Sequence, residues 1–574
     1  MPTKMPQTRI ERNIETMKKT KRIYTPITNI KHMVSVFESR GERTMFDYFD
    51  AEGNIRKITY RALAARVTAF GSGLYRLGRI KGKRTAIIGE TSPSWYVAYL
   101  ATVMFGGTAI PMDKELAVSE IENFLCRAEA DNVVFSPLFA EKFRDVAARH
   151  PEIAFIPMAG AADASYYKSM DEIESIGTGR PHDPSSPSDM DRLAVMLFTS
   201  GTTGTSKCVM LSEKNICAAI NSACEAVDFF PRDVLVSVLP IHHTYELCCS
   251  LAAANYGCEI AINDSLRHCM RNFQTFRPTA LVLVPLFLTT MDKKVWDEIR
   301  KKGVESAVRG LMKLSDGTRK IGLDPRRLLF RDILAAFGGR LEKIICGGAP
   351  LDPKIAADFR SLGIEVWEGY GITECSPLIA VDVYYHSKPG SVGPAVTSCM
   401  VRIEDAVTDE DGHDIGEICV KGKNVMLGYY KDEAATADAF TADGWFRTGD
   451  LGYLDDEGYI YITGRKKSVI VLENGKNVFP EEIEEYLASV DKIAECVVVG
   501  RKSGRETVLT AVVFPNAEKF EADTPESEML ATIRADVNKL NRRLVGYKQV
   551  RNVELRTTPF EKTTSMKIKR HLVK

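Results

Sequence analysis

Residues 197–212 read "LFTSGTTGTSKCVMLS", in which two apolar runs enclose a loop of glycines, hydroxyl residues and one lysine. The run that leads into this loop, "LAVMLFT", is typical of a buried strand. A glycine-rich loop after a strand exposes backbone amides and hydroxyl groups that can surround phosphate oxygens. The stretch therefore predicts a phosphate-binding loop at the end of a strand in an α/β domain.

The spacing excludes the Walker form of such a loop, which is GxxxxGK[ST]. Counted from Gly201, Ser206 stands where the second glycine belongs, and Cys208 stands where the magnesium-binding hydroxyl belongs. A P-loop phosphotransferase or nucleotide triphosphatase is therefore disfavoured. Release of ADP and phosphate, rather than AMP and pyrophosphate, would favour it.

Length and composition limit the class of protein. A chain of 574 residues exceeds what one hydrophobic core usually supports, so we expect two or more domains. With 76 basic and 76 acidic side chains there is no overall charge to favour nucleic acid, and we expect no nucleic acid partner. The thirteen cysteines lack CxxC pairs and zinc spacing, which indicates reduced thiols and a cytoplasmic location.

The N-terminal segment "MPTKMPQTRIERNIETMKKTKRIYTP" is basic but lacks the apolar centre of a signal peptide. A solvated tail is the favoured interpretation, and steering toward an acidic carrier protein or a lipid surface is the alternative. Residues 91–112, "TSPSWYVAYLATVMFGGTAIPM", are uncharged and nearly long enough to span a bilayer. Because Gly106 and Gly107 are followed by a strand-like run, we expect a buried helix and then a strand, with no transmembrane segment.

Apolar runs alternate with helical patterns from Ile58 to about Ala349, which predicts parallel sheets covered by helices. The strand-like runs are "RTAIIG", "NVVFS", "LAVMLFT", "VLVSVLP", "ALVLVP" and "LEKIICGG". A charged helical excursion is expected between residues 287 and 339. We predict a large N-terminal domain at 1–463 with a β-rich subdomain at about 395–463, a hinge at 464–468, and a small, mobile α+β domain at 469–574.

The loop "FTSGTTGTSK" closely resembles the phosphate loop of the AMP-forming, acyl-adenylate-forming enzymes, which include acyl-CoA synthetases, luciferases and peptide-synthetase adenylation domains. Seven further segments resemble motifs of that superfamily and occur in the same order. They are "LPIHHTYEL", "CGGAPL", "EGYGITE", "GSVGPA", "GEICVKGKNVMLGYY", "GWFRTGDLGYLDDEGYIYITGRKKS" and "TTSMKIKR". The resemblance covers about residues 58–570.

The resemblance implies a nucleotide site whose residues come from most of these motifs. The phosphate loop would comprise Thr199, Ser200, Gly201, Thr202, Thr203, Gly204 and Lys207. The purine would be lined by Gly348, Ala349, Pro350, Glu368, Gly369, Tyr370 and Gly371, with the Tyr370 ring stacked on it. Thr373 would contact the α-phosphate, Asp450 the ribose hydroxyls, and Arg465 the ribose or a phosphate. Glu374 and Thr199 would be the magnesium ligands.

The resemblance also implies the residues that act in the reaction. Lys567 corresponds to the adenylation lysine, although Met566 stands where the family more often has glycine. Lys467 corresponds to the hinge position, and His243 to a histidine near the acyl pocket. Glu374 would act through the magnesium ion that it binds. Tyr245, Phe287 and residues near Ile379 are candidates for the wall of that pocket.

The implied reaction activates a carboxylic acid with ATP and Mg²⁺ to acyl-AMP, and then transfers the acyl group to the thiol of CoA or an acyl carrier protein. The motif style resembles that of long-chain fatty acid ligases and acyl carrier protein synthetases most. Alternatives are an aryl or other carboxylate–CoA ligase, a luciferase-like oxidation, and a non-catalytic ATP-binding scaffold. Peripheral contact with a membrane is compatible with this chemistry, and the sequence leaves the oligomeric state open.

Overall fold

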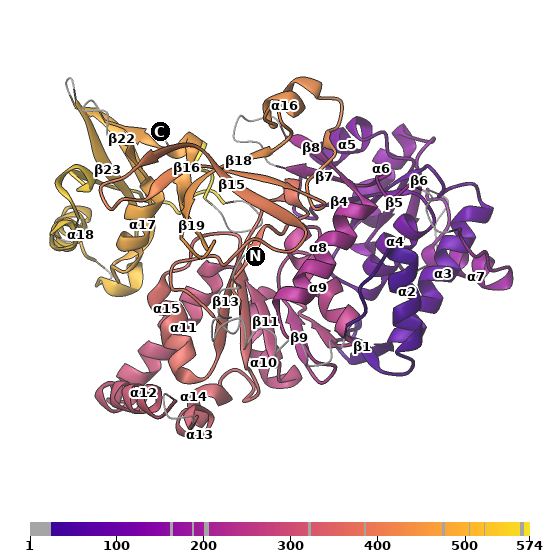
Figure 1. Ribbon diagram of the computed structural model, residues 1–574. Coiled ribbons are helices and arrows are strands. Elements are labelled where there is room, and N and C mark those ends of the chain that lie inside the picture. The colour runs from indigo at the N-terminus through magenta and orange to yellow at the C-terminus, as the bar shows by residue number, and fades with distance from the viewer. Residues whose placement is uncertain are drawn as a thin grey trace, which may run out of the picture.

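The computed structural model describes residues 24–160, 165–185, 189–199, 206–319, 323–383, 386–472, 477–503, 506–521, 523–542, 544–562 and 568–573. Two large, mostly parallel sheets stand side by side and are covered by helices (Figure 1). A smaller antiparallel sheet lies across their upper edge in that view. The C-terminal segment forms a separate α+β unit beside it.

The first large sheet has, in spatial order, β14 (Ala380–Val381), β13 (Glu365–Tyr370), β12 (Lys343–Gly347), β11 (Ala280–Leu283), β9 (Val234–Ser237), β10 (Glu259–Ile262), β1 (Thr44–Phe49) and β2 (Ile55–Thr59). The second has β17 (Gly428–Tyr429), β8 (Lys207–Ser212), β7 (Leu193–Thr199), β4 (Thr108–Met112), β3 (Arg84–Ile88), β5 (Asn132–Phe135) and β6 (Ala154–Pro157). Their central strands are parallel, and the outermost strands β2, β14 and β17 are antiparallel to their neighbours.

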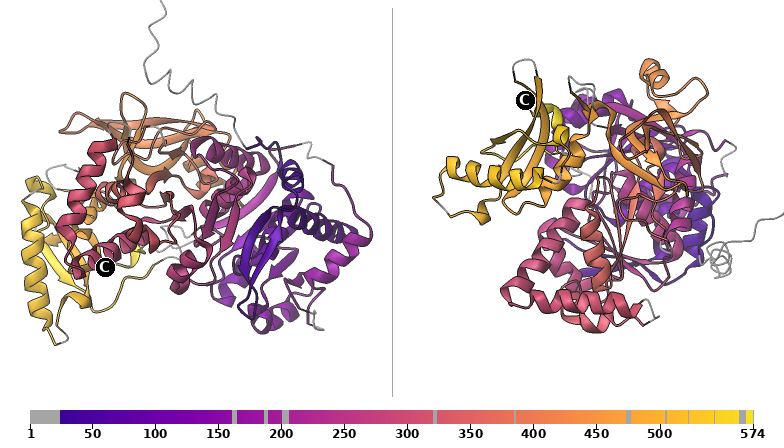
Figure 2. Two further views of the ribbon diagram at one scale, coloured as in Figure 1. Left: turned by 90° about the horizontal axis from the view of Figure 1, so that it is seen from below. Right: turned by 60° about the vertical axis from the view of Figure 1, so that its left-hand side comes forward.

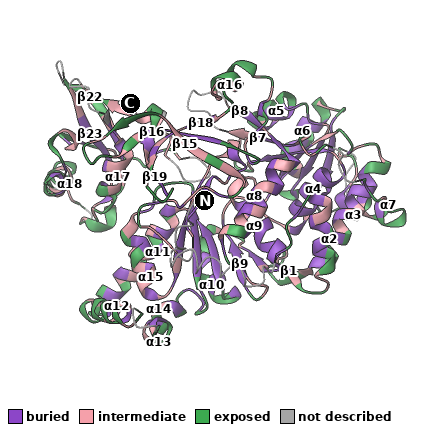
Figure 3. Ribbon diagram, viewed as in Figure 1, coloured by how far each residue is buried: buried purple, intermediate pink, exposed green. Residues whose placement is uncertain are grey.

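Helices cover these sheets and fill the space between them, as the buried ribbon in Figure 3 shows. In the first half of the chain they are α2 (Ile30–Ser39), α3 (Tyr60–Arg76), α4 (Pro93–Met104), α5 (Val118–Arg127), α6 (Ala140–Arg149), α7 (Met170–Gly179), α8 (Glu213–Ala226), α9 (Thr244–Tyr256) and α10 (Cys269–Phe276). Next come α11 (Pro285–Lys301), α12 (Glu305–Arg319), α13 (Arg326–Leu329), α14 (Arg331–Ala335) and α15 (Pro353–Leu362).

The third sheet is an antiparallel array of β15 (Cys399–Thr408), β16 (Asp414–Gly422), β18 (Phe446–Leu454) and β19 (Ile460–Arg465). The short α16 (Glu433–Asp438) lies between β17 and β18 in the chain. Beyond β19 come the pair β20 (Ile470–Val471) and β21 (Asn477–Val478) and the sheet β22 (Ile493–Ser503), β23 (Glu506–Pro515) and β24 (Asn552–Leu555). The helices α17 (Pro480–Ala488) and α18 (Glu526–Asn541) complete this α+β unit, which stands apart from the large sheets in Figure 2.

The predicted α/β class, with a β-rich part and a smaller C-terminal domain, is confirmed. The six strand-like runs form β3, β5, β7, β9, β11 and β12. The domain boundaries and the hinge stay predictions.

The long apolar segment at 91–112 forms the buried helix α4, followed by the strand β4. Ser92 caps the helix through a hydrogen bond from the Trp95 amide, and Pro93 occupies the first turn, where it is tolerated. Gly106 ends this helical segment with a φ of +83°, which glycine adopts without strain. Within the described residues, no helix combines the length and apolar character needed to cross a bilayer.

A buried ion pair connects three strands of the first sheet. The Lys343 Nζ lies 2.9 Å from the Asp233 Oδ2, and the two side chains are 7% and 0% exposed. The other oxygen of Asp233 accepts a hydrogen bond of 2.9 Å from the Thr279 hydroxyl. Because these residues precede or begin β9, β11 and β12, the pair holds neighbouring strands together at one end.

Replacing Lys343 with methionine leaves the Asp233 carboxylate buried without its cation. We expect the free energy of unfolding to fall by about 3–5 kcal/mol, measured by urea denaturation. Lys214→Met is the control, because Lys214 and Asp191 form a pair whose side chains are 42% and 60% exposed. That change should stay below about 1 kcal/mol. Equal losses in the two variants would contradict a special role for the buried pair.

Candidate active site

The ends of the predicted phosphate loop are held by strand pairing. Thr199 ends β7 and is paired with Lys207, which begins the antiparallel strand β8. The Thr199 hydroxyl also donates to the Lys207 carbonyl at 3.4 Å. The loop residues Ser200, Gly201, Thr202, Thr203 and Gly204 lie outside the described residues. The structure thus places the first and last of the predicted loop residues next to each other.

A chain of contacts joins the end of this loop to the predicted magnesium ligand. The Lys207 ammonium lies 4.4 Å from the centroid of the Tyr429 ring, and the Tyr429 hydroxyl donates to the Glu374 Oε1 at 2.9 Å. Burial and the Glu374 carboxylate raise the pKa of Tyr429, so its hydroxyl keeps its proton. β17 carries Tyr429 alongside β8, while Glu374 lies in the 3-10 turn Thr373–Cys375.

Asp450 is the centre of a second group. Its side chain is buried on β18, and its two oxygens lie 2.8 Å from the Tyr370 hydroxyl and 2.7 Å from the Arg465 Nε. Burial raises the pKa of Tyr370 and the Asp450 charge raises it further, so the tyrosine is the donor. Three predicted nucleotide-binding residues, from β13, β18 and β19, therefore meet at one carboxylate.

Glu417 on β16 forms a similar group, in which one cation is Lys466, the residue after Arg465. Its Oε2 lies 2.8 Å from both the Arg447 guanidinium and the Lys466 ammonium, and its Oε1 accepts from the Gly449 amide at 3.2 Å. Glu417 is buried. Arg465 and Lys466, at the predicted hinge, are thus tied to two buried carboxylates, and the exposed Lys467 follows them in the 3-10 turn Lys466–Ser468.

The predicted purine wall follows the ends of β12 and β13. Gly348 has a φ of +92°, and Ala349 and Pro350 continue from it as an exposed loop. On β13, Glu368 and Gly369 pair with the last two residues of β12.

Gly371 turns the chain after β13. A Cβ at this position would lie 1.5 Å from the Pro377 carbonyl oxygen, so only glycine fits. Thr373 begins the next 3-10 turn. The predicted purine residues therefore surround one end of two adjacent parallel strands.

Glu368 is the one carboxyl side chain among the predicted purine residues. Burial and the nearby Asp382 charge raise its pKa to about 8, so it carries a proton at neutral pH. A protonated carboxyl group both donates and accepts hydrogen bonds. This end of the strands can therefore offer a donor and an acceptor to a planar heterocycle.

The histidines lie at the start of α9. His243 occupies the N-cap position, and its ring centroid is 4.1 Å from that of His242. Burial lowers the pKa of His242, which lies 3.7 Å from Asp113, so that imidazole is neutral. Tyr245, in the first turn of this helix, donates to the carbonyls of Leu283 and Ile345 at 3.3 and 3.2 Å. The tyrosine is therefore fixed against the ends of β11 and β12.

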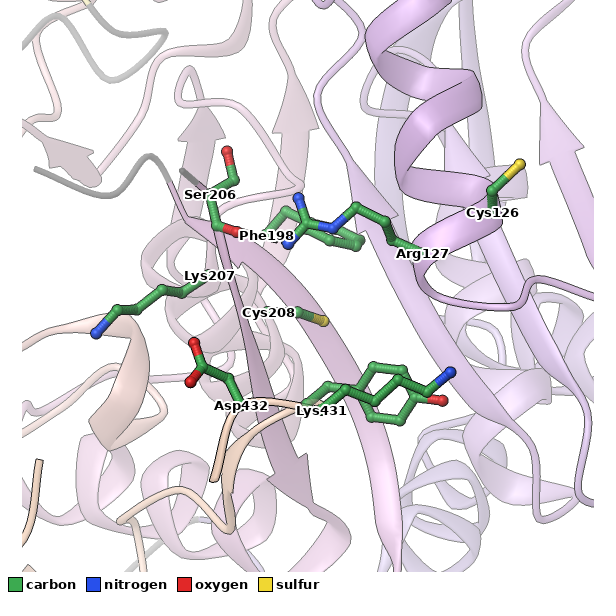
Figure 4. Close-up of a pocket in the computed structure, with 9 residues that line it drawn as sticks. Cys126, Arg127, Phe198, Ser206, Lys207, Cys208, Lys431 and Asp432 are labelled. Atoms are coloured by element: carbon green, nitrogen blue, oxygen red, sulfur yellow. Dashed lines mark hydrogen bonds between the residues drawn. The ribbon is translucent and has the colours of Figure 1, made fainter. Parts of the chain in front are cut away.

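A pocket of about 360 Å³ lies beside the strand ends β7 and β8 (Figure 4). Its lining consists of Cys126, Arg127, Phe198, Ser206, Lys207, Cys208, Tyr430, Lys431 and Asp432. Arg127 lies over the Phe198 ring at 5.2 Å and donates to the Ser206 carbonyl at 2.7 Å. The Lys207 side chain extends away from Arg127 and Lys431 in this view. The Lys207 ammonium is therefore separated from Arg127 and Lys431, the other two cations of the lining.

Sequence reasoning missed Tyr429 and Glu417 as site residues. Both lie in the quoted segment "GEICVKGKNVMLGYY", but no spacing rule marks a tyrosine or glutamate that acts through contacts with distant strands. The predicted catalytic residue Lys567 lies outside the described residues. The roles given to the other site residues stay predictions.

Comparisons with known proteins agree with this arrangement. The AMP-binding enzyme family model matches residues 36–430, and the model of the AMP-binding enzyme C-terminal domain matches residues 467–574. The chain is 27% identical to the Arabidopsis thaliana protein "Long chain acyl-CoA synthetase 7, peroxisomal", over 90% of this chain and 80% of that protein. It is 29% identical to the Mus musculus protein "Long-chain-fatty-acid--CoA ligase 6", over 80% and 70%.

Solved structures extend the similarity to the fold. ATP-bound MatB from Rhodopseudomonas palustris is 26% identical and superposes with a TM-score of 0.72, over 95% of this chain and 98% of that one. The adenylation domain of a Mycobacterium chelonae carboxylate reductase is 20% identical with a TM-score of 0.79, over 99% and 95%, which shows the fold alone. The chain therefore belongs to the AMP-binding enzyme family, and its reaction is an AMP-forming activation of a carboxylic acid.

Proposed function

We propose that the protein is an acid–thiol ligase that converts a medium- or long-chain fatty acid to acyl-AMP and then to a thioester of CoA. The observation that carries the proposal is the pair of contact groups beside the loop, one at Asp450 and one at Glu374. The first offers a carboxylate to ribose and the second a carboxylate to a metal. Asp450 lies on β18 and Glu374 in the 3-10 turn after β13, and Tyr429 connects Glu374 to Lys207 at the end of the predicted phosphate loop.

The donor set fits magnesium, which binds through one or two carboxylates and substrate phosphates. Glu374 would hold the ion with Thr199, and the ion would supply charge neutralisation at the phosphates when bound. Lys207 and the loop would stabilise the departing pyrophosphate. Thr373 would hold the α-phosphate and Asp450 the ribose. Tyr370, Glu368, Gly369 and Gly371, with the loop at Gly348, Ala349 and Pro350, would enclose the purine.

The chemistry needs no protein nucleophile. A carboxylate oxygen of the acid attacks the α-phosphate and pyrophosphate leaves; the thiol then attacks the acyl carbon and AMP leaves. Lys567 would hold the acid carboxylate against the α-phosphate in the first step, because its ammonium offsets the developing charge. His243 would position the acyl group of the acid, and Arg465 would position the ribose of the nucleotide. Rotation of the small domain at Lys467 would then admit the thiol.

The fatty acid assignment draws support from the names of the long-chain relatives and from the motif style. Each methylene buried in an apolar tunnel contributes about 0.8 kcal/mol, so chain length is a natural basis for selection. ATP, Mg²⁺ and CoA are the expected cofactors and co-substrates, and an acyl carrier protein is the alternative acceptor. One relative's name places that relative in the peroxisome. For this chain a cytoplasmic location remains our proposal.

The deciding experiment supplies ATP with palmitate, shorter fatty acids or aryl acids, and then CoA or a carrier protein. We expect AMP and pyrophosphate with the longer acids and a CoA thioester as product. A preference for aryl acids would overturn the substrate assignment. Nucleotide binding without pyrophosphate exchange for any acid would instead indicate a scaffold.

Lys567→Ala tests the adenylation lysine. We expect the variant to lose ATP–pyrophosphate exchange by at least a hundredfold, because the proposed ammonium between the carboxylate and the α-phosphate is removed. Thioester formation from supplied acyl-AMP should persist. The control is Lys569→Ala, at a neighbouring lysine. Normal exchange in the Lys567 variant would show that another lysine serves this step.

Lys467→Pro tests the hinge, because proline removes the backbone freedom that a domain rotation needs. We expect pyrophosphate exchange close to that of the unmodified protein and thioester formation reduced at least tenfold. Both rates are measured on one preparation. Lys467→Ala, which keeps backbone freedom, is the control. Equal loss of both half-reactions would contradict the proposal.

Tyr429→Phe tests the contact between the loop and the metal ligand. Loss of a hydrogen bond to a charged group costs roughly 1.5–3 kcal/mol, so the magnesium concentration for half-maximal exchange should rise about tenfold or more. Tyr430→Phe is a matched control, since the Tyr430 hydroxyl donates to the exposed Glu129 instead. An unchanged magnesium requirement in Tyr429→Phe would separate Tyr429 from the metal site.

A further inference from the structure

Arg127, the last residue of α5, contacts the chain on both sides of the predicted phosphate loop. We call residues 198–199 and 206–207, which flank that loop, its two stems. The guanidinium carbon lies 5.2 Å from the centroid of the Phe198 ring, and Nη2 donates to the Ser206 carbonyl at 2.7 Å. Figure 4 shows the Arg127 side chain extending from α5 toward both residues. One side chain therefore connects the two stems.

The contact with the first stem belongs to an aromatic stack. Phe124 precedes Arg127 by three residues on α5, so the two side chains are neighbours on one face of the helix. The rings of Phe124 and Phe198 are stacked, with their centroids 4.1 Å apart and an interplanar angle of 1°. The guanidinium carbon of Arg127 lies 5.7 Å from the Phe124 centroid, within the range of a cation–π contact with both rings. The helix thus holds the end of β7 with a ring and a cation together.

The contact with the second stem bears on Lys207. The Ser206 carbonyl and the Lys207 amide belong to one planar peptide unit, so the hydrogen bond from Arg127 orients the backbone where β8 begins. The Lys207 side chain extends away from Arg127, and its ammonium lies 4.4 Å from the centroid of the Tyr429 ring. Lys207 is therefore held at its backbone from α5 and at its ammonium from β17.

The helix that carries Arg127 is firmly packed. Phe124 and Leu125 are buried in a cluster that also contains Phe135 and Phe143. Arg127 itself is exposed, so its replacement opens no cavity in that core. A change at this position should therefore alter the contacts with the stems and leave the surrounding fold intact.

We propose that Arg127 is a positioning residue for the phosphate loop, which holds the two stems in place and so supports binding of the β- and γ-phosphates of ATP. The inference rests on the proposed function, in which this loop holds the departing pyrophosphate. A loop whose ends are already fixed loses less conformational freedom when it closes on an anion. In this role Arg127 acts through Phe198 and Ser206 and not by contact with the nucleotide.

Equilibrium binding of ATP and of AMP to the full-length Arg127→Met variant, with Mg²⁺ and without an acid substrate, tests the proposal. We expect the Kd for ATP to rise about fivefold or more, because an exposed cation–π contact and a hydrogen bond from a charged group are lost together. The Kd for AMP should stay unchanged, since AMP lacks the two phosphates that the loop would hold. Arg127→Lys keeps the charge without the planar guanidinium, so its Kd for ATP should lie between the two.

Arg149→Met is the matched control. Arg149 is also an exposed arginine at the end of a helix, and it binds α5 through Glu122 at 2.7 Å instead of a loop stem. Its affinity for ATP should equal that of the unmodified protein. Phe198→Leu provides a second measurement. Combined with Arg127→Met, it should cost less ATP affinity than the sum of the two single changes, because both remove the same contact.

Three outcomes would overturn the proposal. They are an unchanged affinity for ATP in Arg127→Met, an equal loss of affinity for ATP and AMP in that variant, and an equal loss of ATP affinity in Arg149→Met. Nucleotide binding requires no turnover. Failure of the proposed enzymatic function would therefore be seen separately, as normal binding of ATP by the unmodified protein without pyrophosphate exchange.

Discussion

The buried carboxylates of Asp450 and Glu417 are the constraint on which the nucleotide side of the structure depends. A buried carboxylate is costly unless cations and hydrogen-bond donors surround it. Asp450 obtains these from Tyr370 and Arg465, and Glu417 from Arg447 and Lys466. Satisfying them fixes β13, β16, β18 and β19 relative to one another. It also fixes Arg465 and Lys466 on the large part of the protein, so we infer that a rotation of the small domain begins at Lys467.

Much of the fold could be predicted because its central strands are buried on both faces. Such strands are continuous apolar runs, and runs such as "RTAIIG" and "ALVLVP" stand out against the helical segments between them. Gly106 and Gly107 indicated from the sequence that the apolar helix before them is a buried helix and not a transmembrane one. The sequence contains no comparable pattern that shows which strands, distant in the chain, pair with each other. β17 joins the edge of the second sheet beside β8, more than two hundred residues earlier, and nothing local marks Gly428 and Tyr429 as a strand.

The candidate site, like the fold, could be predicted from the sequence only in part. Asp450, Arg465 and Glu374 could be predicted as site residues from the sequence, because each belongs to a segment that resembles a family motif. The contacts among them could not be predicted, since they depend on which side chains the fold brings together. Tyr429 connects Lys207 to Glu374 only because β17 lies against β8. The raised pKa of Glu368 likewise follows from burial and from Asp382, fourteen residues away in the chain.

These contacts bear on the different roles proposed for Lys207 and Lys567 in the reaction. The Lys207 ammonium rests on an aromatic ring whose hydroxyl is committed to Glu374, so its position is set before a nucleotide arrives. Charges fixed in advance stabilise a developing anion without reorganisation, which suits the departing pyrophosphate. A thiol, however, must later reach the acyl carbon, and a lysine held permanently beside that carbon would obstruct it. We therefore infer that the fixed lysine belongs to the leaving group and that the attacking end is served from the separate C-terminal domain.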